Sequence, residues 1–244
     1  LNFWLYTLLI FARMAAFIVV APFYSIGQIP PLFKGALSLG IAMLLYPVIP
    51  LPVLENMQLF TFILVVIGEV FVGLIIGYTA SLIFSAIRIA GQLLDIQMGL
   101  AMAAIFDPQS QSQNTLISQF LYSLGVLVYM ILDGHHQLLQ SLAKSYELIP
   151  LSSFELRDGQ MMWQMIEIFT GTFLLALRIG APILAVLIIV DLSLGLVART
   201  VPQLNVFILS FPIKIGLGIL ALAIVTPLLA SMLSSVFNLI QKDL

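Results

Sequence analysis

The chain has 244 residues, of which 61% are hydrophobic and 8% are charged, with a mean hydropathy of +1.16. Soluble domains typically carry about 25% charged residues, so this composition excludes an ordinary water-soluble globular protein. The net charge of -2 gives no signal for a polyanion ligand, and the lack of cysteine excludes disulfides and thiolate metal sites.

Long uncharged runs indicate helices at membrane depth. They include residues 35–54, 70–87 and 215–241. A helix of about 20 apolar residues spans the hydrocarbon core of a bilayer. Residues 183–190 are apolar throughout, whereas the strands of a membrane barrel alternate apolar and polar residues. The sequence therefore predicts an all-α membrane protein.

Six long helical segments are expected in chain order. They cover about residues 3–20, 32–46, 58–104, 116–146, 161–198 and 206–240. Proline lacks a backbone donor and disfavours helix before it, so the proline cluster at residues 47–52 should end the second segment. The fifth should be interrupted at Gly180 to Pro182, and the sixth contains Pro212 and Pro227. We therefore expect helices that are partly broken by proline.

One stretch between two apolar segments is polar and uncharged. It runs from Gln109 to Thr115, directly after Asp107 and Pro108. Such a stretch cannot face lipid, because irregular backbone at membrane depth needs a protein-lined or aqueous environment.

The distribution of Lys and Arg gives a weak signal for orientation. With the N-terminus outside, Lys34, Arg88, Arg199 and Lys214 fall on the cytoplasmic side, against Lys144, Arg157 and Lys242 outside. This favours an arrangement with both ends outside.

Four ionisable residues interrupt apolar runs: Arg13, Glu69, Arg178 and Asp191. A charge at membrane depth costs at least about 2.5–3.5 kcal/mol, so such residues normally face protein, water or an opposite charge. They could form a proton or ion relay, or they could pair within or between subunits. No run of carboxylates follows one helix face, so pairing is favoured.

The two histidines, His135 and His136, follow Asp133 and Gly134. A metal site would need further ligands at suitable spacing, so a polar cap at a helix end is favoured. No nucleophile, phosphate-binding or metalloprotease motif occurs in a sensible context. The sequence therefore predicts no catalytic residue, no metal and no cofactor, and it does not favour an enzyme.

Two groups of small or flexible residues point to close packing. Gly73 and Gly77, together with Gly68, form a strip that lets a second helix approach closely. Met98 and Met102 lie among small residues, and flexible thioethers fill irregular gaps and can re-pack. The two methionines could form an adaptable gasket or ordinary core.

A six-helix secondary transporter of a small solute is the alternative interpretation of the broken helices. Residues 31–35 and 212–216 are weakly alike, but their unequal spacing makes no convincing inverted repeat. A transporter would work as an isolated chain, whereas a subunit of an assembly would need partners.

Three further motifs occur in order along the chain. They are Gly91-Gln-Leu-Leu-Asp-Ile-Gln-Met-Gly-Leu-Ala-Met-Ala-Ala-Ile-Phe-Asp-Pro108, Asp133-Gly134-His135-His136, and the stretch from Ala198 to Lys214 with its Pro-Gln and Phe-Pro steps. Together they resemble the FliR family. Its members, with counterparts in virulence secretion systems, are membrane subunits of the type III protein export gate.

The resemblance implies an architecture and partners. Family members join FliP and FliQ in a helical gate around a pore for unfolded proteins, in the bacterial inner membrane within the flagellar basal body. Residues 1–157 would be a FliP-like helical part, and residues 158–244 a FliQ-like helical hairpin. Other export-apparatus membrane proteins, membrane lipid and unfolded protein substrates would be further partners, and nucleic acid would not.

The resemblance also implies site residues. The family places a loop inside the pore as a plug, which here is Phe106, Asp107, Pro108, Gln109, Ser110, Gln111, Ser112 and Gln113. Met98 and Met102 would seal beside it. A turn at the pore entrance would contain Arg199, Pro202, Gln203, Asn205 and Lys214. The protein would conduct polypeptide without covalent chemistry.

Overall fold

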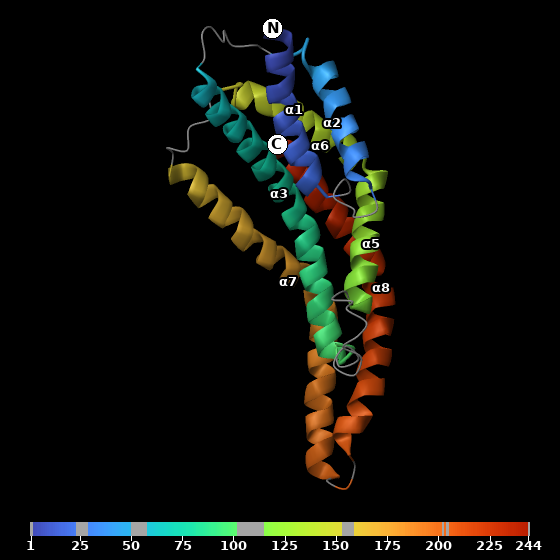
Figure 1. Cartoon of the computed structure of the whole chain (residues 1–244). Helices are drawn as coiled ribbons and strands as arrows, with labels where there is room; N and C mark the ends of the chain where they lie inside the picture. The colour runs from blue at the N-terminus through green and yellow to red at the C-terminus, as the bar shows by residue number, and fades with distance from the viewer. Residues whose placement is uncertain are drawn as a thin grey trace. The chain divides into compact units, whose positions relative to one another are not determined.

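The computed structural model describes residues 2–22, 29–49, 58–101, 115–152, 159–201, 203 and 205–243. Within these ranges the chain forms seven α-helices and no strand (Figure 1). They are α1 (Asn2–Val20), α2 (Pro31–Leu45), α3 (Leu59–Met98), α5 (Leu116–Ile131), α6 (Gly134–Leu148), α7 (Gly159–Thr200) and α8 (Val206–Asp243). The prediction of an all-α fold is confirmed.

Four helices are long and apolar enough to cross a membrane. The candidate spans are Phe3–Val20, Leu59–Met98, Met165–Thr200 and Val206–Ser235, and α5 with α6 makes a fifth if the pair is counted as one broken span. α2 is apolar but has only 15 residues. These spans, found among the described residues, confirm the prediction of a membrane protein.

Local sequence explains several helix ends. α2 begins at Pro31, where the missing N–H of proline would have had no partner within the helix. α3 ends at Met98, and Gly99 follows with a φ of +81°, a conformation that glycine adopts readily and that stops a helix. α8 begins after Asn205, whose Oδ1 accepts a hydrogen bond from the Ile208 N–H at 3.4 Å.

The interruption expected at Gly180 to Pro182 is wrong. α7 runs from Gly159 to Thr200 with Pro182 inside it. Proline removes one hydrogen bond from a helix interior, and membrane helices tolerate this loss where local adjustments or neighbouring groups satisfy the freed carbonyl. α8 likewise continues through Pro212 and Pro227.

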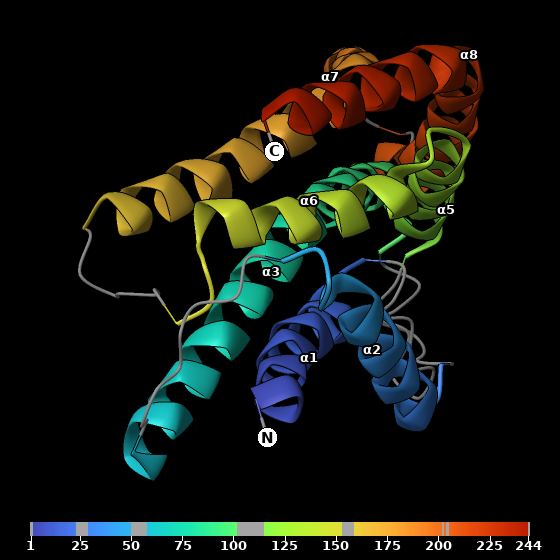
Figure 2. The same ribbon diagram turned by 90° about the horizontal axis from the view of Figure 1, so that it is seen from above.

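The chain folds into two compact units, each made of separate segments. The first unit combines Leu1–Ile83 with Asp133–Ile168. In it α1 and α2 lie side by side (Figure 2), and the fully buried side chains include Leu9 and Phe17 of α1 and Tyr146 of α6. This unit is therefore organised around α1.

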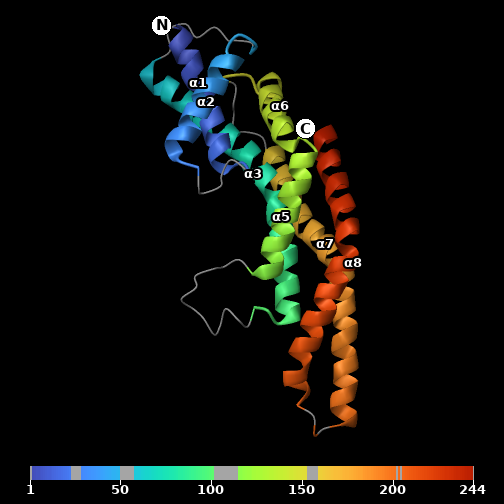
Figure 3. The ribbon, with the colours of Figure 1, turned by 90° about the vertical axis from the view of Figure 1, so that its right-hand side faces the viewer.

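The second unit combines Phe84–Leu132 with Phe169–Asp243. The end of α7 runs beside the beginning of α8 as a hairpin (Figure 3), and α5 contacts α8. Leu94 and Met98 at the end of α3 and Leu121 of α5 are almost completely buried. The last turns of α3 therefore belong to the core of this unit.

Large apolar side chains are exposed on several helices. Leu32 on α2 is 86% exposed, Leu59 on α3 is 77% exposed and Trp163 on α7 is 73% exposed. Extended apolar surface of this kind is suited to lipid or to other protein subunits.

Candidate functional site

The first unit contains a buried ion pair. The Arg13 Nε on α1 donates to the Glu69 Oε2 on α3 at 2.6 Å, and the two side chains are 0% and 1% exposed. The sequence predicted that both residues pair within or between subunits, and the structure pairs them with each other.

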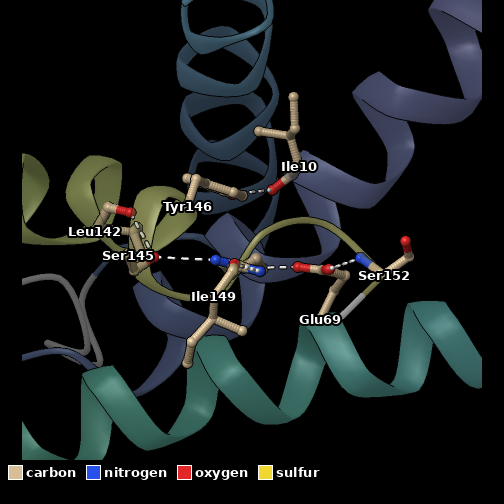
Figure 4. Close-up of polar contacts among 8 residues, drawn as sticks. Ile10, Glu69, Leu142, Ser145, Tyr146, Ile149 and Ser152 are labelled. Carbon is tan, nitrogen blue, oxygen red and sulfur yellow. Dashed lines mark hydrogen bonds and ion pairs between the residues drawn. The ribbon is translucent and has the colours of Figure 1, made fainter. Parts of the chain in front are cut away.

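Neighbouring groups satisfy the remaining polar atoms of this pair (Figure 4). The Arg13 guanidinium donates to the Ser145 Oγ at 3.1 Å and to the Ile149 carbonyl at 3.0 Å. The Glu69 Oε1 accepts from the backbone N–H of Ser152 at 3.1 Å. A buried ion pair is stable only when such additional bonds are made. The cluster therefore ties α1 and α3 to the end of α6 and the turn after it.

Tyr146 closes the cluster on one side. The Arg13 guanidinium carbon lies 4.0 Å from the centre of the Tyr146 ring, a cation–π contact. The Tyr146 hydroxyl donates to the Ile10 carbonyl on α1 at 3.4 Å. The ring and the hydroxyl of Tyr146 thereby both fix α6 against α1.

The predicted glycine strip packs α3 against α1. A Cβ atom at Gly73 would lie 2.2 Å from the Arg13 carbonyl oxygen, and one at Gly77 would lie 3.0 Å from the Phe17 carbonyl oxygen. The close approach expected at these two glycines is confirmed.

A second polar cluster lies in the other unit and is not among the sites predicted from the sequence. Asp95 on α3 is fully buried and accepts hydrogen bonds from the backbone N–H groups of Ile117 and Ser118 at 3.1 and 3.0 Å, and from the Thr115 hydroxyl. An ionisable residue near the end of an apolar helix, followed by Thr and Ser at the start of the next, is a signal that could have revealed it.

A third cluster joins three helices of the same unit. Asp191 on α7 makes an ion pair with Lys214 on α8, and the Gln97 amide on α3 donates to the Asp191 Oδ2 at 2.7 Å. The side chains of Lys214 and Asp191 are 19% and 38% exposed, so the chain alone does not bury this pair completely. The predicted pairing of Asp191 thus occurs within the chain.

Arg178, the fourth predicted charge, is exposed on α7 and makes no ion pair among the residues that the structure describes. Its predicted pairing within the chain is therefore not observed, and pairing with another subunit stays a prediction.

Of the two methionines predicted to form a gasket, the structure describes only Met98. Met98 is fully buried in the second unit, where its thioether lies against Gly218 of α8. Met102 lies outside the described residues, as does the whole predicted plug from Phe106 to Gln113. Within the chain, Met98 is a core residue.

The predicted entrance turn is shorter than expected. Arg199 is exposed in the last turn of α7, and Gln203 and Asn205 are exposed between α7 and α8. Pro202 lies outside the described residues. Lys214 lies within α8 and not in the turn, because α8 already begins at Val206.

Asp133, His135 and His136 lie at the start of α6. One ligand atom from each comes within 4.8 Å of the others, so three groups could reach one ion. The Asp133 carbonyl accepts from the N–H groups of His136 and Gln137 at 3.0 and 3.2 Å, as at an ordinary helix start. Asp133 and His136 are exposed, and we assign the cluster no chemistry beyond this.

The chain matches a known protein family over nearly its whole length. The family is described as "Bacterial export proteins, family 1", and the match covers residues 4–240.

Individual relatives agree with this match. The chain is 32% identical over 238 residues to the flagellar biosynthetic protein FliR of Bacillus subtilis (strain 168), covering 95% of this chain and 90% of the relative. It is 30% identical over 240 residues to the FliR protein of Pectobacterium carotovorum, covering 96% and 90%. It is also 30% identical over 226 residues to the Yop proteins translocation protein T of Yersinia pestis, covering 90% and 84%.

Proposed function

The chain belongs to family 1 of the bacterial export proteins, and from this we propose that it is a subunit of the type III gate that exports unfolded flagellar proteins. The observation that carries the proposal is the end-to-end similarity both to flagellar biosynthetic proteins and to a translocation protein. The description of the family as export proteins and the name of the translocation protein both point to the movement of other proteins across a membrane.

The structure supports the role of a subunit. The buried charges of Arg13 and Glu69 are satisfied within the chain, whereas large apolar side chains are exposed on α2, α3 and α7. A solute transporter would need polar groups free to bind its solute. The pairing of these charges, and of Asp191 with Lys214, argues against that alternative for the described residues.

We propose FliP-like and FliQ-like proteins as the partners, in the bacterial inner membrane within the flagellar basal body. Residues 1–157 would take the place of a FliP-like subunit, and residues 158–244 that of a FliQ-like hairpin. The exposed apolar faces of α7 and α8 would pack on those partners. The gate would carry out no covalent chemistry and hold no cofactor.

Residues 106–113 are proposed to plug the closed pore. Their amide and hydroxyl side chains suit a watery interior, and their single charge, on Asp107, leaves little fixed attraction for a passing polypeptide of either sign. Deleting Phe106–Gln113 should raise ion leakage through the assembled gate. Unchanged conductance at equal gate content would remove these residues from the closing role.

Complementation tests the function as a whole. The chain, with an affinity tag, is expressed in a flagellated bacterium that lacks its own FliR, and secreted filament protein and swimming are measured. Restored secretion, with co-purification of FliP and FliQ, is the expected result. A chain that purifies alone and catalyses solute uptake in vesicles would overturn the proposal in favour of the transporter.

A further inference from the structure

The beginning of α5 is capped by a side chain from another helix. The Asp95 carboxylate on α3 accepts hydrogen bonds from the backbone N–H groups of Ile117 and Ser118, the second and third residues of α5. The first N–H groups of a helix have no partner within it, and a side chain at the N-cap position usually supplies one.

The residue at the N-cap position of α5 does not cap the helix with its own side chain. Thr115 occupies the N-cap position in an extended conformation, yet its side chain makes no capping hydrogen bond. Its hydroxyl donates instead to the Asp95 carboxylate. Asp95 therefore replaces the local cap and collects three donors from one short stretch of chain.

Backbone contacts fix the register of α5 on α3 at the same place. A Cβ atom at Gly91 would lie 2.2 Å from the Ser118 Cα, so the two backbones touch there. The Ser118 Oγ also donates to the Arg88 carbonyl at 3.1 Å. The start of α5 thus cannot slide along α3 without breaking these contacts.

The last turn of α3 is held from the other side by α7 and α8. Gln97 donates to Asp191, Met98 lies against Gly218, and a Cβ atom at Gly99 would lie 2.5 Å from the Phe211 ring. The chain on both sides of residues 102–114 is therefore anchored within one compact unit.

We propose that Asp95 is a positioning residue of the export gate. It holds the start of α5 at the level of the end of α3, and thereby fixes the two points between which residues 102–114 run. The effect on the pore rests on the proposed role of Phe106–Gln113 as a plug. Losing the carboxylate should free the start of α5 and weaken closure, while the gate still assembles.

Two pairs of variants distinguish the effect of the Asp95 carboxylate from that of other changes on α3 and at Thr115. Asp95→Asn keeps the side-chain volume but turns one acceptor into a donor that faces N–H groups. Gln92→Ala, on the exposed side of the same helix, is its control. Thr115→Val removes one donor to Asp95, and Thr115→Ser keeps it.

Hydrogen exchange in the purified gate complex tests the capping directly. In Asp95→Asn the amides of Ile117 and Ser118 should exchange about tenfold faster or more, since hydrogen bonds to charged groups are among the stronger ones. Thr115→Val should give a smaller increase, and Thr115→Ser and Gln92→Ala should match the parent. Unchanged exchange at these two amides in Asp95→Asn would overturn the inference.

Ion leakage in intact cells, at equal amounts of assembled gate, tests the consequence. Asp95→Asn is expected to leak more than the parent, in the direction of the Phe106–Gln113 deletion. Leakage from the deletion but none from Asp95→Asn would overturn the positioning role and leave the plug standing. If the deletion itself does not leak, the proposed plug fails, and the exchange measurement alone decides whether Asp95 holds α5.

Discussion

Arg13 and Glu69, 56 positions apart in the sequence, meet as a hydrogen-bonded ion pair that is almost completely removed from solvent. Their remaining polar atoms are taken by Ser145, Ile149 and Ser152. The pair thus joins the beginning of the chain to its middle. Two charges in an apolar protein are tolerable here because each one satisfies the other.

Removing one partner of this pair should be strongly destabilising. Glu69→Ala leaves the Arg13 charge buried without its carboxylate, at an expected cost of about 3–5 kcal/mol. The thermal midpoint and the yield of the purified gate complex should both fall. The double variant Arg13→Met/Glu69→Leu removes both charges and should recover much of the loss. A single variant as stable as the parent would show that the pair is dispensable.

Gly73 should tolerate no side chain. A Cβ there would lie 2.2 Å from the Arg13 carbonyl oxygen, which is backbone and cannot rotate away. Gly73→Ala must therefore push α1 from α3, at an expected cost of about 1–3 kcal/mol. Gly35→Ala on α2 is the matched control, because nothing lies within 4 Å of its Cβ position and alanine favours helix. Equal thermal midpoints for the two variants would contradict the close helix contact.

The pair of Asp191 and Lys214 should behave differently from the buried one, because it is partly exposed. Such pairs contribute about 0–1 kcal/mol and are screened by salt. Lys214→Ala should therefore lower the thermal midpoint only slightly, and the difference from the parent should shrink as salt is raised. The swapped variant Asp191→Lys/Lys214→Asp should regain part of the difference at low salt. A large loss that salt does not change would indicate that the pair is desolvated in the assembly.

The sequence predicts the helices better than their contacts. Uncharged runs and proline clusters mark the apolar segments, since length and hydropathy are local properties. The interruption predicted at Pro182 is wrong because a helix packed in a folded protein tolerates the loss of one hydrogen bond, whereas an isolated helix would break there. The sequence also predicts one segment over residues 116–146 with a polar helix end at His135 and His136, and the structure divides this segment at Asp133 into α5 and α6.

The identity of charge partners could not be predicted from the sequence. The sequence predicts that Arg13 and Glu69 each need a partner, because a charge among apolar residues is unfavourable. That they pair with each other follows only from the crossing of α1 and α3. No buried or capping role is predicted for Asp95, because it lies close to the end of its apolar run, where an aspartate is commonly exposed to solvent. Thr115 and Ser118 at the start of the next helix are the local signal for its partners, but the capping itself depends on α5 returning to α3, a tertiary contact.

Met98 offers a test that separates core packing from sealing. It is fully buried, so Met98→Ala should leave a cavity and cost about 2–5 kcal/mol, whereas Met98→Leu should cost less than about 1.5 kcal/mol. Gly218→Ala places a methyl group 2.5, 2.9 and 3.0 Å from the Cε, Sδ and Cγ of Met98, so the buried Met98 side chain must shift and this variant should also lower the thermal midpoint. The thermal midpoint of the complex and ion leakage are measured together. Met98→Ala should lower the midpoint, and a rise in leakage at equal gate content would add the sealing role. A midpoint that does not change would contradict the assignment of Met98 to the core.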